Sequence, residues 1–301
     1  MLRLPEFQLE RPETLSQACA LLREHGAGAR IIAGGTDLVV NMKQGFEGAD
    51  VLVSLTRIPG LTGIEDQAGG LVIGAMTTLE QLAEDAQVAA RFPGLSQAAG
   101  LVAGPHQRRV GTIGGNVCLN TRCVYINQTQ EWREALGHCL KGGGDVCHVV
   151  PGGKNCVAAA SNDTATALIA LGATLEIAGT DGMRQIHVAD FFNSDGISNK
   201  MLEPDEILTG VLLPAPPDGA FSGYEKLRPR GSIDYPRLSV AVAGAADGGR
   251  IMDLVIVLSA LAARPLVLKD AQELAAGRIV DDALLDELAA LAVSKAKPLS
   301  S

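Results

Sequence analysis

Strand-like and helix-like segments alternate along the N-terminal part of the chain. The segment TLSQACALLREHG (residues 14–26) begins at a threonine that can cap a helix and ends at a glycine, as a helix does. The next segment, ARIIAGGTDLVVNMKQG (residues 29–45), predicts a buried strand, a glycine turn and a short helix. ADVLVSLTRIPGLTGI (residues 49–64) supplies another strand. We therefore expect the chain to open with a βαβ-like unit.

The alternation continues as far as a proline-rich boundary. Residues 70–104 predict a strand followed by two helices, and residues 162–192 predict a further helix and strand. DEILTGVLLPAPP (residues 205–217) ends in prolines, which cannot continue a central strand, so we place a domain boundary at residue 214. The remainder predicts a small α+β domain, with strands at residues 220–229, 238–247 and 251–261 and a helix at residues 280–296.

Composition and charge exclude several classes of partner. Of the 301 residues, 47% are hydrophobic and 20% are charged, as is ordinary for a soluble globular protein. A net charge of −9 argues against nucleic-acid binding, which relies on clustered Lys and Arg. No apolar run approaches the roughly 18 residues of a membrane span, and the N-terminus lacks the apolar core of a signal peptide. We therefore expect a cytoplasmic protein with no nucleic-acid partner and no membrane span.

Four of the six cysteines lie close together, between residues 121 and 156, in a segment otherwise poor in apolar residues. Disulfides are improbable in reducing cytosol, so clustered thiols are more often metal ligands or redox-active groups. Cys19 instead falls within apolar residues at helical spacing, which indicates a small buried core residue. Cys118 precedes the cysteine segment, and we expect it to pack below a glycine turn, although its proximity makes it a fallback ligand.

Two glycine turns are candidates for binding an anion. AGGTDL (residues 33–38) and TIGGN (residues 112–116) each place paired glycines after an apolar run, where backbone N–H groups can approach a diphosphate. Such pairs often serve only the turn. Neither turn matches GxGxxG or a P-loop with its lysine, so a standard Rossmann dinucleotide site and an NTPase are both poorly supported.

Four stretches in this order resemble the FAD-binding medium subunits of the molybdenum hydroxylases, the family of xanthine dehydrogenase and carbon monoxide dehydrogenase. They are IIAGGTDLVV, VAGPHQRRVGTIGGNVC, SNDTATALIALGA and YEKLRPRGSIDYPRLSVAVA. The resemblance covers nearly the whole chain and implies an α+β fold. It implies a two-lobed FAD-binding domain of the vanillyl-alcohol oxidase (PCMH) type over residues 1–214, with lobes at about 1–57 and 58–214. A C-terminal domain of the CO dehydrogenase flavoprotein type follows at residues 215–301.

The resemblance also implies an FAD site. Residues 33–38 would wrap the diphosphate, with polar contacts from Thr36 and Asp37, and the second turn would complete the cradle. Asp163 would contact the adenosine side, unless it is only a helix N-cap. The full set is Ile32, Ala33, Gly34, Gly35, Thr36, Asp37, Leu38, Ala103, Gly104, Thr112, Gly114, Gly115, Asn116, Asp163, Leu208 and Lys226.

Residues toward the C-terminus are expected near the flavin ring. Lys226 would lie near the isoalloxazine edge, where its charge would favour the anionic reduced flavin; the alternative is an exposed strand charge. Leu208 would be an apolar contact. Ser232, Asp234 and Tyr235 resemble a family segment that approaches the ring, although a tyrosine before proline is also a normal loop anchor.

The cysteine segment is an insertion relative to most of the family. It resembles the insertion of the 4-hydroxybenzoyl-CoA reductases, which binds a [4Fe-4S] cluster, and the resemblance makes Cys123, Cys139, Cys147 and Cys156 the candidate ligands. A zinc site would use the same thiolates but commonly shows CxxC-like pairs, which are absent here. Unligated cysteines are the third possibility. His138 and His148 adjoin cysteines, and we expect them to be solvated or hydrogen-bonded.

The chain shows no catalytic constellation for substrate turnover, so we expect cofactors to supply the chemistry. The resemblance implies an electron-relay subunit of a molybdenum-containing hydroxybenzoyl-CoA reductase. Electrons would pass from ferredoxin through [4Fe-4S] and FAD to a small subunit with two [2Fe-2S] centres and a molybdopterin large subunit, in a dimer of heterotrimers. The overall reaction would be reductive dehydroxylation. One alternative is the FAD subunit of an oxidising hydroxylase for a purine, aldehyde or N-heterocycle, and another is a zinc-stapled assembly module without flavin.

Overall fold

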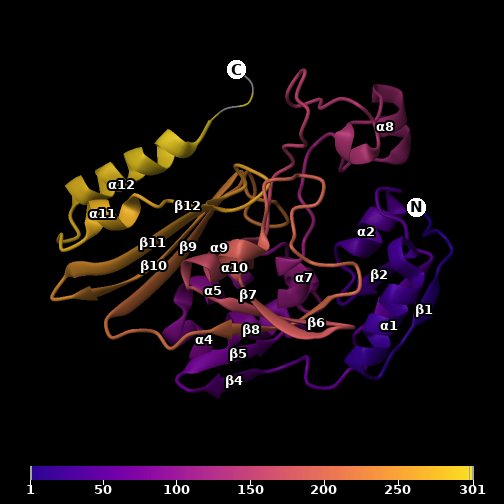
Figure 1. Ribbon diagram of the computed structural model, residues 1–301. Helices are drawn as coiled ribbons and strands as arrows, with labels where there is room; N and C mark the ends of the chain where they lie inside the picture. The colour runs from indigo at the N-terminus through magenta and orange to yellow at the C-terminus, as the bar shows by residue number, and fades with distance from the viewer. Residues whose placement is uncertain (1, 298, 300–301) are drawn as a thin grey trace.

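The computed structural model describes residues 2–297 and 299 and contains three β-sheets in chain order (Figure 1). The first sheet is parallel, with strand order β1-β3-β2. Its strands alternate with two helices, which confirms the βαβ-like opening. The elements are β1 (Gln8–Glu10), α1 (Leu15–His25), the 3₁₀ turn η1 (Gly26–Gly28), β2 (Ala29–Ile32), α2 (Leu38–Lys43) and β3 (Val51–Ser54).

Helix α1 forms where the sequence predicts it. The Thr14 hydroxyl accepts a hydrogen bond from the Gln17 amide at 3.2 Å, and Gly26 at φ +48° ends the helix. The apolar face packs on the first sheet and, through Cys19, on residue Ala178 of the second. Cys19 is 1% exposed, so its prediction as a core residue is confirmed.

The second sheet has five antiparallel strands in the order β4-β5-β8-β6-β7. Three helices follow β5 where the sequence predicted two, because the Asp85 carboxylate ends one helix and caps the next. Its Oδ1 accepts from the amides of Gln87 at 2.9 Å and Val88 at 3.0 Å. The strands are β4 (Ile64–Gln67), β5 (Gly70–Gly74), β6 (Thr174–Gly179), β7 (Gly182–His187) and β8 (Ile207–Leu213). The helices are α3 (Leu79–Glu84), α4 (Ala86–Arg91), α5 (Pro93–Gly100), α6 (Pro105–Arg108), α7 (Ile113–Val117), α9 (Asp163–Ala170) and α10 (Val188–Phe191).

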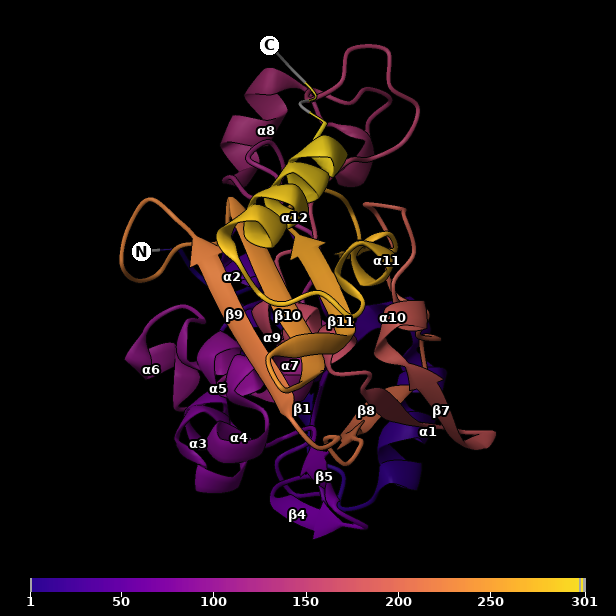
Figure 2. The same cartoon turned by 90° about the vertical axis from the view of Figure 1, so that its left-hand side faces the viewer.

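The third sheet is antiparallel, with strand order β12-β11-β10-β9, and helices cover both of its faces. Helices α5 and α9 pack on one face, and all residues of α9 are buried there. Helices α11 and α12 lie across the other face (Figure 2). The elements are β9 (Ala220–Leu227), β10 (Leu238–Asp247), β11 (Arg250–Ser259), β12 (Leu266–Val267), α11 (Ala271–Ala275) and α12 (Asp282–Lys295). The predicted strands and C-terminal helix are therefore present, and β12 and α11 are additional.

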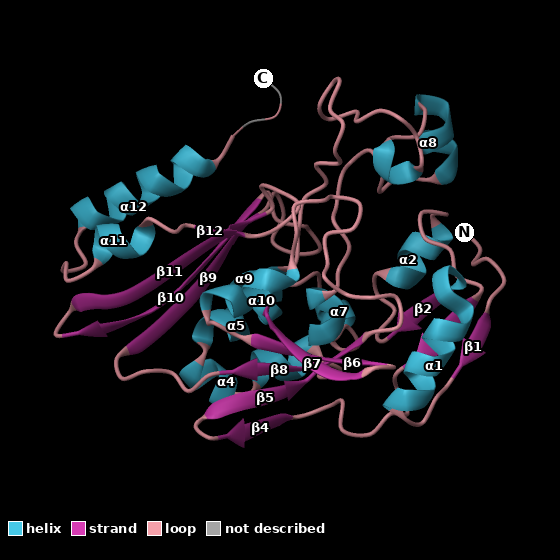
Figure 3. Cartoon of the chain, in the orientation of Figure 1, coloured by secondary structure: helices cyan, strands magenta, loops and turns pink. Residues whose placement is uncertain are grey.

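The cysteine segment forms a protruding loop of mostly irregular structure (Figure 3). It contains α8 (Gln130–Leu136) and the 3₁₀ turn η2 (Leu140–Gly142). Its neck is closed by two backbone hydrogen bonds of 2.8 Å between Arg122 and Ala159. The buried Arg133 guanidinium donates to the Gly45 carbonyl at 2.9 Å, which fixes α8 against the end of α2. Among the described residues, no helix has both the length and the hydropathy needed to cross a membrane.

Candidate functional site

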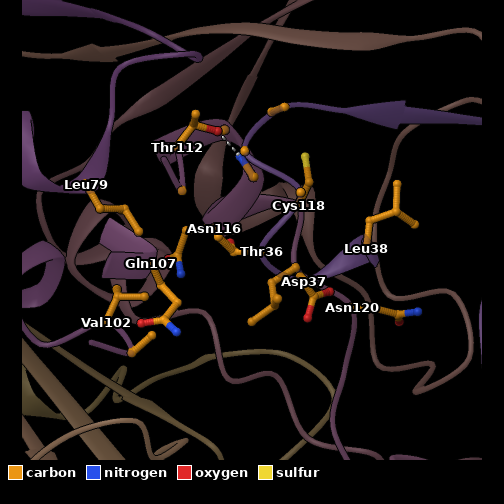
Figure 4. Close-up of a pocket in the computed structure, with 18 of the residues that line it drawn as sticks. Thr36, Asp37, Leu38, Leu79, Val102, Gln107, Thr112, Asn116, Cys118 and Asn120 are labelled. Atoms are coloured by element: carbon orange, nitrogen blue, oxygen red, sulfur yellow. Dashed lines mark hydrogen bonds between the residues drawn. The ribbon is translucent and has the colours of Figure 1, made fainter. Parts of the chain in front are cut away.

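A large cavity of about 730 Å³ is lined by residues from the segments that carry the three sheets. Its volume is within the range of small-molecule and cofactor sites, roughly 300–1,000 Å³. Both glycine turns line it, as the side chains of Thr36, Asp37, Thr112 and Asn116 show in Figure 4. Residues of α9, β8, β9 and the 233–235 segment complete the wall. The predicted FAD residues lie on its wall except Ile32, whose side chain packs near the small core around Met42, and Gly104, which precedes α6.

The first glycine turn lines the cavity and has amides without acceptors. A Cβ on Gly34 would lie 1.9 Å from the Val110 carbonyl oxygen, so only glycine permits the two turns to approach this closely. Gly35 has φ +69°, a conformation that also favours glycine. Within the described chain, the amides of Gly34, Gly35 and Thr36 have no hydrogen-bond acceptor. Successive free N–H groups in such a turn form a site for an anion.

The second turn is fixed by polar contacts to α9. The Thr112 hydroxyl accepts from the Gly115 amide at 3.1 Å. A dashed line at Thr112 marks this bond in Figure 4. The buried Asn116 side chain accepts through Oδ1 from both the amide of Thr164, at 3.0 Å, and its hydroxyl, at 2.6 Å. Asn116, one of the predicted FAD residues, therefore connects α7 to α9 and positions this wall of the cavity.

Asp163 and Lys226 form a buried ion pair on that wall. Their side chains are 3% and 1% exposed, and Nζ lies 3.0 Å from the carboxylate. Tyr224 donates its hydroxyl proton to the same carboxylate at 2.5 Å. Burial raises the pKa of Asp163 and lowers the pKa of Lys226, and the pairing opposes both shifts. Helix α9 has Asn162 at its N-cap, so neither the cap role of Asp163 nor an exposed Lys226 is correct.

The pairing places the two predicted residues at one point of the wall. Asp163, expected at the adenosine side, and Lys226, expected at the isoalloxazine edge, are hydrogen-bonded to each other at 3.0 Å. Asp163 also neutralises the Lys226 charge. The pair therefore presents a polar, hydrogen-bonding surface in place of an isolated cation.

The 228–237 loop closes one side of the cavity in a strained conformation. Ile233 has φ +60°, an outlier for a β-branched residue, and its amide donates to the Ala103 carbonyl at 2.9 Å. Ala103 itself has φ +42°. Ile233, Asp234 and Tyr235 line the cavity, so two of the residues singled out in this loop lie at the site. Ser232 instead donates to the Ala103 carbonyl at 3.3 Å.

Several cavity residues carry no motif and were missed in the sequence. Lys141 belongs to the inserted loop, and Lys200 belongs to the connection between α10 and β8. Burial lowers the pKa of Lys141 to about 8 and also lowers the pKa of Lys200. No spacing rule connects the two lysines, because tertiary contacts alone bring them together. Cys118, which the sequence placed beside the second glycine turn, lines the same cavity, and burial raises the pKa of its thiol to about 11.

The four cysteines of the inserted loop line one small cavity of about 10 Å³, termed here the cysteine cavity. Tight turns bring them together. A Cβ on Gly144 would lie 1.9 Å from the His138 carbonyl oxygen, and one on Gly196 would lie 2.6 Å from that of Cys156. His148 also lines the cysteine cavity, and its Nε2 lies 2.8 Å from the Gly137 carbonyl oxygen. The lining cysteines are Cys123, Cys139, Cys147 and Cys156.

The donor set suits a Cys₄ centre, although the space is small. In the described part of the chain, no three His, Cys, Asp or Glu side chains are grouped closely enough to hold one metal ion. A zinc site would place each sulfur about 2.3 Å from a common ion. Four cysteine thiolates, one on each iron, are also the ligand set of an iron–sulfur cubane. The cavity has room for about one water molecule at most, so a cubane would need the surrounding loop to open.

Comparisons with known proteins agree with the geometry of the large cavity. Residues 5–216 match the family described as "FAD binding domain in molybdopterin dehydrogenase", and residues 223–301 match the "CO dehydrogenase flavoprotein C-terminal domain". These matches confirm the predicted fold class. The carbon monoxide dehydrogenase medium chain of Afipia carboxidovorans is 32% identical over 98% of this chain and 88% of its own.

Other relatives are named for other substrates. The FAD-binding subunit of an Escherichia coli aldehyde oxidoreductase is 34% identical over 81% of this chain and 80% of its own. Among solved structures, carbon monoxide dehydrogenase from Hydrogenophaga pseudoflava matches with a TM-score of 0.80 at 28% identity, covering 99% of this chain and 90% of that one. The likeness therefore extends through both predicted domains.

Proposed function

We propose a function from the premise that this chain belongs to the family of FAD-binding subunits of the molybdopterin dehydrogenases, the molybdenum hydroxylases. The chain binds FAD and is a subunit of an oxidoreductase. FAD supplies electron transfer when it is bound. We infer that the FAD bound to this chain exchanges electrons with a molybdopterin large subunit and a small subunit with two [2Fe-2S] centres. The three subunits would form a dimer of heterotrimers.

The free amides of the first glycine turn carry the proposal for this chain's own residues. They belong to residues that line the large cavity and would hold the FAD diphosphate, and Gly34 keeps the two turns close enough to share it. The Asp163–Lys226 pair would then orient one polar part of the cofactor without adding net charge. The strained loop that carries Ile233 would exclude water from the opposite wall.

The names of the relatives favour an enzyme that oxidises its substrate. Their names specify carbon monoxide, aldehyde and nicotinate dehydrogenases or oxidoreductases. We therefore favour the FAD subunit of an oxidising hydroxylase, the alternative in our sequence prediction, over the hydroxybenzoyl-CoA reductase. A flavin-free zinc module is not supported, because the family binds FAD.

A reductase remains a second candidate because of one observation, the convergence of four cysteine thiols in the inserted loop. We propose that Cys123, Cys139, Cys147 and Cys156 would hold a [4Fe-4S] cluster. Cluster potentials span roughly −700 to +450 mV, so a cluster here could accept electrons from a low-potential donor such as ferredoxin. In an oxidising enzyme the same centre would instead offer an exit for electrons.

Flavin absorbance of the complete enzyme, purified anaerobically with its partner subunits, separates the two candidates. Bleaching after addition of an aldehyde, a purine, an N-heterocycle or carbon monoxide supports the oxidising enzyme. The reductase is supported if none of these bleaches the flavin, while reduced ferredoxin bleaches it and 4-hydroxybenzoyl-CoA restores the absorbance. A complex without flavin contradicts both candidates.

A further inference from the structure

We propose that Arg122 and Lys141 couple the two cavities, so that an occupied cysteine cavity increases the affinity of the large cavity for FAD. Both residues belong to the inserted loop or its neck, and each contacts residues of the large cavity. The inference rests on the proposed function, because it concerns FAD in one cavity and an iron–sulfur cluster in the other. Arg122 and Lys141 act as positioning residues.

Arg122 joins the loop to two walls of the large cavity. It precedes the candidate ligand Cys123, and its guanidinium forms an ion pair with Asp37 of the first glycine turn. The same guanidinium lies over the Tyr235 ring, 4.8 Å from its centroid. Asn41 completes the contact, donating to the Asp37 carboxylate at 3.1 Å. A shift of Arg122 would therefore change the position of both Asp37 and Tyr235, which line the FAD cavity.

Lys141 lies on the shared wall of the two cavities. Among the described residues it alone lines both of them. Its ammonium donates to the Asn120 side-chain oxygen at 2.8 Å and to the Gly196 carbonyl at 2.7 Å, and it also contacts the Thr121 hydroxyl. Asn120 lines the large cavity. Lys141 follows the candidate ligand Cys139 by two positions, so a cluster would fix the backbone that carries it.

Apart from the neck at Arg122 and Ala159 and the buried Arg133, the inserted loop has little regular structure. Most of its residues are exposed or half-buried, and regular structure is limited to α8 and η2. A cluster would cross-link four points of this loop and reduce its conformational freedom. Because the cluster has already ordered Arg122 and Lys141, FAD binding loses less conformational entropy, which gives positive coupling. By reciprocity, FAD increases the affinity for the cluster by the same factor.

The experiment measures FAD affinity by quenching of flavin fluorescence, in the flavin-free chain before and after anaerobic reconstitution with iron and sulfide. We expect the dissociation constant to fall about tenfold on reconstitution of the wild type, within the usual range of coupling between sites. In Arg122→Gln and Lys141→Gln, the ratio of the FAD dissociation constant before reconstitution to that after it should approach one. Arg122→Lys keeps the charge but loses the planar stacking and paired hydrogen bonds, so it should also lower the ratio while preserving the fold.

Arg91→Gln is the matched control. Arg91 also forms an ion pair, with Asp66 at 2.7 Å, and lies 5.5 Å from the centroid of the Phe92 ring, but it lines neither cavity. The control should keep the wild-type ratio. If wild type takes up iron and FAD independently, the coupling is refuted while the proposed cofactors stand. If the ratio survives in both Arg122 variants and Lys141→Gln, these residues do not transmit it. Failure to take up iron refutes the coupling together with the proposed cluster.

Discussion

Replacing Lys226 with methionine should destabilise the chain strongly, because it leaves the Asp163 carboxylate buried without its cation. Nζ lies 3.0 Å from the carboxylate, and both side chains are almost fully buried. Tyr224 would remain as a donor to this carboxylate. Removing one partner of a buried pair typically costs about 3–5 kcal/mol, since the remaining charge is desolvated. We expect a loss of this size in the free energy of unfolding at pH 7.5, measured by urea denaturation of the flavin-free chain.

The pH dependence of this variant provides an internal test. Burial raises the pKa of Asp163 above its ordinary value, and loss of Lys226 removes an opposing charge. At a pH between the pKa of Asp163 in the unfolded chain and its higher pKa in the folded chain, the folded state binds more protons than the unfolded state. The free energy of unfolding therefore falls as the pH rises through this range. The destabilisation of Lys226→Met should therefore be largest at pH 7.5 and should decrease as the buffer is acidified and Asp163 becomes protonated.

The double variant Asp163→Asn/Lys226→Met isolates the pair interaction. It removes both charges, so it should be more stable than Lys226→Met alone by about 1–3 kcal/mol, within the usual range for residues in contact. A loss below about 1 kcal/mol in the single variant would refute the account of a buried, mutually dependent pair. A double variant whose losses are additive would refute it as well.

Three further perturbations test other parts of the site. Gly34→Ala should raise the FAD dissociation constant at least about tenfold in a fluorescence titration, because its Cβ would meet the Val110 carbonyl at 1.9 Å; Gly48→Ala, which has open space, should not. Burial raises the pKa of the Cys118 thiol to about 11, so only about 0.1% is thiolate at pH 8. Its alkylation by iodoacetamide, followed by peptide mass spectrometry, should be slow at pH 8 and accelerate toward pH 11; rapid reaction at pH 8 would contradict the burial. Cys147→Ser should lose iron and retain FAD, whereas iron retention equal to that of a Cys19→Ala control would exclude Cys147 as a ligand.

Local signals were sufficient for much of the fold. The cap at Thr14, the glycine turn at residues 33–38 and the prolines after β8 each act through neighbouring residues, so the βαβ-like opening and the C-terminal strands were predictable. The split between α3 and α4 was missed because it depends on the Asp85 side chain capping α4. Such a residue can equally continue a helix or interrupt it when only the sequence is read.

Contacts between distant segments account for what the sequence did not predict at the site. Resemblance identified both glycine turns, but the Asp163–Lys226 pair required α9 to pack on the third sheet, against β10 and β11, beside the strand that carries Lys226. Lys141 and Arg122 carry no motif, and their relation to the cavity depends on how the inserted loop folds back onto the first turn. The ionic contact of Arg122 with Asp37 spans 85 positions, and its stacking contact with Tyr235 joins segments still farther apart, so neither leaves a periodic trace in a single sequence.

The cofactor content of the anaerobically purified chain tests the central claim most directly. Flavin is measured by absorbance, iron and zinc by elemental analysis, and the cluster by EPR after reduction with dithionite. The account predicts about one FAD and about four irons per chain, with a [4Fe-4S] signal that Cys139→Ser removes while FAD remains bound. One zinc without iron, or FAD in a chain that takes up neither metal, would contradict the proposed cluster. A chain that binds no FAD would contradict the assignment of the large cavity.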